Sequence, residues 1–98
     1  MIANGPVTDK SGSTHATPGT STLLAAANPS RKYLFIQNLD AAATLHINFT
    51  SDAHITNAGS IKIGPGLYFA MDGSYICSES INVAASSASV KFTAKEGA

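Results

Sequence analysis

The segment Thr44–Thr50, with the sequence TLHINFT, decides the fold class of this chain. Its apolar residues Leu45, Ile47 and Phe49 occupy alternate positions, and the residues around them are polar or His. Because successive side chains of a strand point to opposite faces, this period of two predicts a β-strand with one buried and one solvated face. Residues 33–36, with the sequence YLFI, are apolar at every position. They predict a central strand covered on both sides, and one of the two covers could be another subunit.

The remaining sequence divides into short apolar segments separated by turn residues. Including the two segments above, strands are predicted at residues 20–26, 31–38, 43–50, 60–63, 67–71, 75–77, 80–84 and 89–94. Asn28-Pro29-Ser30 and Gly64-Pro65-Gly66 are typical of tight turns, the second of type II, and residues 39–42 and 86–88 are predicted hairpin loops. About seven or eight short strands at this spacing predict an all-β fold, a compact antiparallel β-sandwich or barrel-like domain.

Residues 1–19 differ in composition from the rest of the chain. They are rich in Gly, Pro, Ser and Thr, and apart from Met1 their only sizeable apolar residues are Ile2 and Val7. Such a segment predicts an extended N-terminal arm that is either flexible or bound to a partner, for example by strand addition to a partner's sheet. We expect residues 20–98 to form the β-sandwich domain, since 98 residues suffice for one domain and not two.

The composition favours contact with other proteins. Charged residues are 12% of the chain, about half of the usual share, and the formal net charge is +0. No basic cluster of the kind that nucleic acids require is present, and no apolar run is long enough to cross a membrane, so neither is an expected partner. The first residues lack the pattern of a signal peptide. Cys77 is the single cysteine, and we expect it to pack as a small apolar residue.

The sequence contains no recognisable catalytic constellation. His46, His54 and Asp52 are the nearest approach to a metal site, but zinc needs three or four converging ligands, and we expect the histidines to be solvated surface residues. The aspartates lie singly in predicted turns, and no nucleophile elbow or phosphate loop is present. We therefore predict no enzyme, no catalytic residue, no metal ligand and no cofactor, with a paired-carboxylate hydrolase as the least favoured alternative.

Several segments are similar to motifs of one protein family. Residues 25–38 read AAANPSRKYLFIQN, residues 45–49 read LHINF, and residues 59–66 read GSIKIGPG. Together they resemble small virion structural proteins of tailed bacteriophages, over roughly residues 20–96. The resemblance implies a non-enzymatic capsid decoration or cement protein, made in the host cytoplasm and located on the capsid surface of the virion.

The resemblance also implies partners and an interface. The major capsid protein or other virion proteins are the expected partners, and a homo-oligomer is expected, with a trimer as the first choice. Tyr33, Phe35 and Tyr68 are predicted to line the interface, and Arg31 and Lys32 to pair with acidic capsid groups. A tail, neck or fibre-anchoring adaptor is one alternative. A glycan-binding host-recognition module is another, in which exposed tyrosines would stack against sugars.

Overall fold

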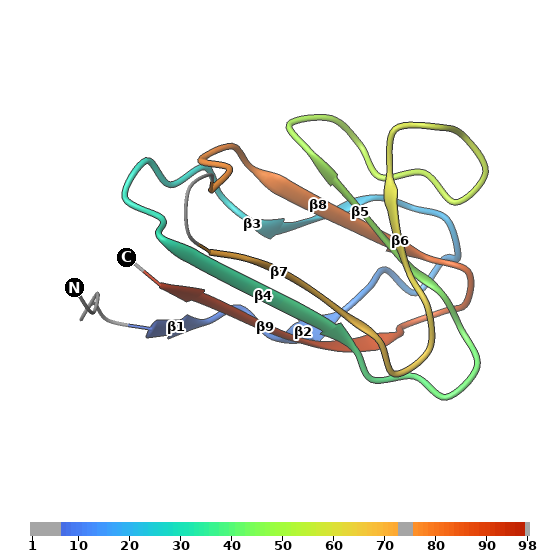
Figure 1. The fold of residues 1–98 in the computed structure, drawn as a ribbon. Helices are drawn as coiled ribbons and strands as arrows, with labels where there is room; N and C mark the ends of the chain where they lie inside the picture. The colour runs from blue at the N-terminus through green and yellow to red at the C-terminus, as the bar shows by residue number, and fades with distance from the viewer. Residues whose placement is uncertain (1–6, 73–75, 98) are drawn as a thin grey trace.

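The computed structural model describes residues 7–72 and 76–97, and it confirms the all-β fold class. Within these residues the chain forms nine strands in two antiparallel sheets, which Figure 1 shows as the two layers of a β-sandwich. The strands are β1 (Val7–Asp9), β2 (Gly12–Ser13), β3 (Thr22–Ala25), β4 (Tyr33–Asn38), β5 (Leu45–Phe49), β6 (Ile61–Ile63), β7 (Tyr68–Met71), β8 (Ile81–Ala85) and β9 (Lys91–Gly97). No helix that could cross a membrane occurs in this part of the chain.

The two sheets exchange strands as the chain proceeds. The first sheet has the order β1-β9-β4-β7, with β2 also paired to β9, and the second has the order β3-β8-β5-β6. Strands β5 and β6 form a hairpin, but residues 39–42 and 86–88 each connect a strand of one sheet to a strand of the other. The prediction of hairpin loops at these two places is therefore wrong. Alternation identifies the buried face of a strand but does not identify the sheet to which it belongs.

The core lies between the sheets and follows the predicted alternation. Leu45 and Ile47 of β5 have no exposed surface, and Phe49 is half-buried with its ring centroid 6.3 Å from that of Phe69 on the opposite sheet. The other fully buried large apolar side chains in the described residues are Leu34, Ile36, Ile81, Val83 and, just before β9, Val90. Each such residue contributes about 1.5–3 kcal/mol by leaving water, so the inner faces of β4, β5 and β8 make a large contribution to stability.

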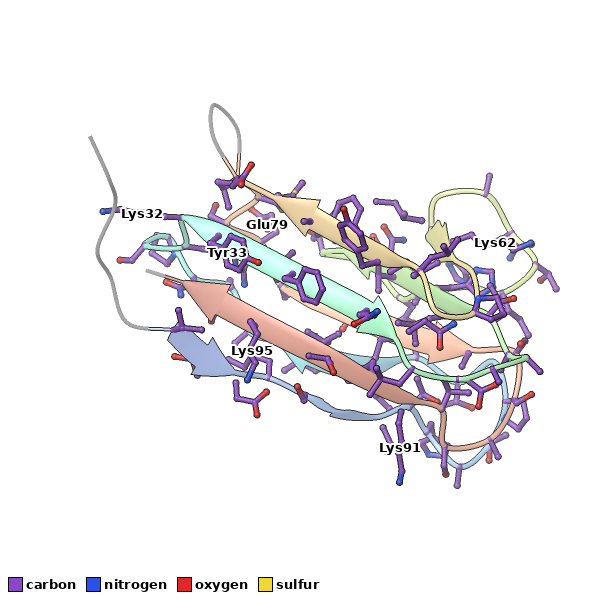
Figure 2. All side chains as sticks on the ribbon, turned by 60° about the horizontal axis from the view of Figure 1, so that its bottom comes forward. Lys32, Tyr33, Lys62, Glu79, Lys91 and Lys95 are labelled. Atoms are coloured by element: carbon purple, nitrogen blue, oxygen red, sulfur yellow. The ribbon has the colours of Figure 1, made fainter. Side chains whose placement is uncertain are left out.

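The prediction that β4 is a central strand is confirmed, because β9 and β7 flank it. Its inner residues Leu34, Ile36 and Asn38 are buried, whereas the alternate residues are half-buried. Figure 2 turns this outer face forward and shows no other strand of the described chain in front of it. The second cover that the apolar run predicts is thus not supplied by residues 7–72 or 76–97.

The two predicted tight turns form as their residues predict, whereas one predicted strand is not present in the described residues. The N–H of Leu67 donates to the Gly64 carbonyl at 3.1 Å and Gly66 has φ 73°, which is the geometry of a type II turn. The Arg31 N–H likewise closes the turn at residues 28–30 by donating to the Asn28 carbonyl. Tyr75 lies outside the described residues, and residues 76–77 are not in a strand.

Part of the predicted N-terminal arm forms two short strands of the first sheet, β1 and β2. Residues 7–9 and 12–13 pair with β9 of the same chain, and Gly19 donates its N–H to the Ala85 carbonyl. Residues 7–19 are therefore part of the β-sandwich, and the predicted boundary between an arm and a domain at residue 20 is not present in this structure. Residues 1–6 lie outside the described residues.

Candidate interaction surface

The strongest candidate surface is the outer side of β4 and β7. Tyr33 and Phe35 belong to β4. They point away from the core, as the odd-numbered residues of that strand do. Gln37 lies opposite Tyr68 on β7, so Tyr68 points to the same side. The rings of Phe35 and Tyr68 stack with centroids 5.4 Å apart and planes 27° apart. The structure therefore brings together Tyr33, Phe35 and Tyr68, which we name the aromatic face.

Tyr68 is the exposed residue of the aromatic face, whereas Tyr33 and Phe35 are half-buried, and further exposed apolar residues lie on neighbouring segments. Tyr68 is 65% exposed, and its neighbour Leu67 is 61% exposed. Leu39, which is 54% exposed, follows Asn38, and Asn38 exchanges main-chain hydrogen bonds with Gly66 and Leu67. Exposed apolar residues from two adjacent chain segments therefore lie at one end of the first sheet. Exposed apolar groups that gather in this way are typical of surfaces that bind other proteins.

The same side of the sheet carries mostly positive charge. Lys91 and Lys95 occupy outward positions of β9, as Figure 2 shows, and Lys32 is exposed at the end of the sheet just before β4. The one outward carboxylate described on the strands of this sheet is Asp9, whose Oδ1 lies 3.5 Å from Lys95 Nζ. Hydrogen bonds from Ser11, and then the charge of Lys95, hold the pKa of Asp9 below its ordinary value. A partner that offers carboxylates would complement this surface.

Arg31 is not part of this surface, which corrects its predicted role. Its side chain has no exposed area, and its Nε donates to Glu96 Oε1 at 2.6 Å. Its Nη1 donates to the carbonyls of Cys77 and Glu79, and its Nη2 donates to the carbonyl of Ala26. Arg31 therefore joins β9 to the segments after β3 and before β8, and its guanidinium is turned into the molecule.

The sequence pattern of β9 indicates a buried carboxylate, although neither Arg31 nor Glu96 taken alone indicates an ion pair. In β9 the inward positions are Phe92, Ala94 and Glu96, so a carboxylate continues a row of buried apolar residues. A charged residue at an inward position needs a buried partner, and Arg31 is the cation that the fold places there. Cys77, whose carbonyl takes part, is buried as predicted.

The histidines do not gather into a metal site. His46 is 9% exposed, so the expectation of a solvated side chain is wrong for this residue. The reason is the loop after β5, whose Ala53 N–H donates to Ser21 Oγ and which thereby crosses the outer side of the second sheet. Burial, and then the charge of Lys62, lowers the pKa of His46. No cluster of three or more His, Cys, Asp or Glu able to hold a metal occurs in residues 7–72 or 76–97.

Comparison with protein-family models, with curated proteins and with solved structures finds no match to this chain. The feature of the surface that bears on function is therefore Tyr68, which is exposed and stacked on the half-buried Phe35, with exposed apolar residues and the lysines of β9 on the same sheet.

Proposed function

We propose that this chain is a non-enzymatic structural protein of a tailed-bacteriophage virion, a decoration or cement protein that binds the head lattice as a homo-oligomer. The observation that carries the proposal is the aromatic face, on which Tyr68 stacks on Phe35 and is still 65% exposed. Exposed tyrosines next to apolar residues are typical of residues that dominate binding energies at interfaces. The virion setting comes from the resemblance of residues 20–96 to small phage structural proteins.

The low charge of the chain supports assembly as its task. Six acidic and six basic residues give a net charge of +0, and Arg31 and Glu96 neutralise each other inside the protein. Little electrostatic repulsion then opposes the approach of further copies. Because Arg31 is buried, the cations that contact acidic capsid groups in this proposal are Lys32, Lys91 and Lys95.

Oligomer formation is tested first, because it requires the purified chain alone. We expect sedimentation velocity at about 10 µM to show an oligomer, and Tyr68→Ser to weaken it by about 2 kcal/mol, roughly thirtyfold in dissociation constant. Leu23→Ser is the matched control, since Leu23 is 62% exposed but lies on the second sheet. A wild-type chain that stays monomeric at this concentration contradicts the oligomer.

Location on the particle is tested by cryo-electron microscopy of the virion. Density at threefold or quasi-threefold positions of the head lattice supports the decoration role. Density confined to the portal vertex or the tail supports a neck, tail or fibre-anchoring adaptor instead.

The glycan-binding alternative uses the same aromatic face. It is tested by titrating oligosaccharides against tyrosine fluorescence, with Tyr68→Ser as the variant that abolishes the response. A saturable response in a chain that neither oligomerises nor occurs in the virion would replace the structural role.

A further inference from the structure

The edge of β9 is filled by residues 7–15 of the same chain, which we name the edge strand. Val7 lies opposite Gly97, Ser13 lies opposite Lys91, and the His15 carbonyl accepts the Ser89 N–H at 3.1 Å. Each step forward along the edge strand matches one step back along β9, so one register holds over its whole length. Figure 1 shows β1 and β2 following β9 in this way.

The edge strand adds little to the hydrophobic core. Every residue of β1 and β2 is exposed, including Val7 at 64%, and Thr14 is the one buried residue of the segment. Its attachment therefore consists mainly of hydrogen bonds and the exposed Asp9–Lys95 ion pair. Detaching it would leave the apolar core between the two sheets largely in place.

The fit between the edge strand and β9 is nevertheless specific. Ser11 Oγ accepts the Ala94 N–H at 2.9 Å, and Thr14 Oγ1 accepts the Val90 N–H at 2.9 Å. Gly12 lies beside the ring of Phe92, at a distance where an added Cβ would make ordinary contact. Hydroxyl groups at these two positions match two N–H groups of the body. Residues 7–15 therefore match this edge of β9, and the same residues of a second copy of the chain would match it equally well.

The short segment between the edge strand and β3 is where the edge strand could detach from the rest of the domain. Residues 16–18 are exposed, and residue 18 is a proline. The chain is anchored again at Gly19, which has φ 80° and donates its N–H to the Ala85 carbonyl. A change of direction within residues 16–18 would release the edge strand without moving β3.

We infer that the edge strand exchanges between copies, so that residues 7–15 of one chain pair with β9 of a second copy. The same hydrogen bonds form within a chain and between chains, so the balance is set by concentration. A segment on a short tether has an effective concentration in the millimolar range, and exchange therefore becomes substantial at roughly 1 mM protein. It occurs in the purified chain, and it uses the edge of the first sheet opposite to β7.

The test joins two variants, each of which carries one new exposed cysteine in addition to the buried Cys77. Ser13 and Lys91 are both exposed, and they form a pair that lies between the hydrogen-bonded pairs at Gly12 and Thr14, where Cα atoms approach to about 4.5 Å. That separation suits a disulfide. Ser13→Cys and Lys91→Cys chains are mixed, equilibrated under mild warming and oxidised briefly, and linked peptides are identified by mass spectrometry. We expect a covalent dimer of one chain of each kind, rising more than tenfold between about 10 µM and about 1 mM.

Two controls are needed: one shows that both substitutions permit the native register, and the other measures disulfides formed by random collision. The Ser13→Cys/Lys91→Cys double variant should form the disulfide within one chain at 10 µM, which shows that both substitutions permit the native register. A mixture of Thr56→Cys, in the exposed loop after β5, with Lys91→Cys measures random collision. If the Ser13–Lys91 mixture at 1 mM gives no more dimer than this control, exchange does not occur. That result would leave the aromatic face untouched, since its oligomer is measured at 10 µM, where exchange contributes little.

Discussion

The buried Arg31–Glu96 pair makes the sharpest prediction about stability. Replacing Arg31 by Met keeps most of the side-chain length and removes every donor, so Glu96 keeps a buried carboxylate without its cation. The carbonyls of Cys77, Glu79 and Ala26 also lose their donors. Removing one partner of a buried pair costs about 3–5 kcal/mol. A domain of this size has a free energy of unfolding of about 5–15 kcal/mol, so the loss is a fifth of it or more.

The assay is urea unfolding followed by far-ultraviolet circular dichroism at pH 7. With a slope of about 1–3 kcal/mol per molar urea, Arg31→Met should lower the midpoint by at least about 1 M. The matched control is Lys32→Met, which removes the same charge from the next residue, an exposed one, and should change stability by no more than about 0.5 kcal/mol.

A double variant separates the ion pair from simple packing. In Arg31→Met/Glu96→Leu no uncompensated carboxylate remains, so this protein should be more stable than Arg31→Met alone. The reasoning is refuted if Arg31→Met is no less stable than Lys32→Met. It is also refuted if the double variant is less stable than Arg31→Met by the full cost of a separate Glu96→Leu change.

Three further predictions concern the core, a turn and pH. Ile47→Ala should lower the free energy of unfolding by about 2–5 kcal/mol in the same assay, whereas Leu23→Ala, at an exposed position, should lower it by less than about 0.5 kcal/mol. Gly66→Ala should cost about 1 kcal/mol, measured by thermal unfolding, because φ at this residue is 73°. The pKa of His46 is lowered in the folded state, so the unfolded chain binds the proton more readily; stability should be complete above about pH 6.5 and fall as the pH decreases below it. Melting temperatures between pH 7.5 and 5 should show this fall in the wild type and less of it in His46→Gln, with His15→Gln, at an exposed position, as control.

The sequence predicted the properties that depend on neighbouring residues. Alternation in Leu45, Ile47 and Phe49 determines which face of β5 is buried, because strand geometry sends successive side chains to opposite sides. The type II turn at residues 64–66 follows from Pro65, which sets its own φ, and from Gly66, which tolerates a positive one. Tyr33, Phe35 and Tyr68 were predicted to line an interface; the pairing of β4 with β7 places them on one side of the first sheet, and the interface itself stays a prediction.

Only the tertiary structure decided what depends on residues far apart in the chain. The sequence by itself established an all-β chain with a defined buried face on each main strand, since those are local properties of alternation and turn chemistry. It could not establish that β4 and β5 belong to different sheets, nor that residues 7–15 lie along β9. For the same reason it placed Arg31 on the surface: whether a cation is exposed depends on what the fold brings beside it, and here that is Glu96, 65 residues away.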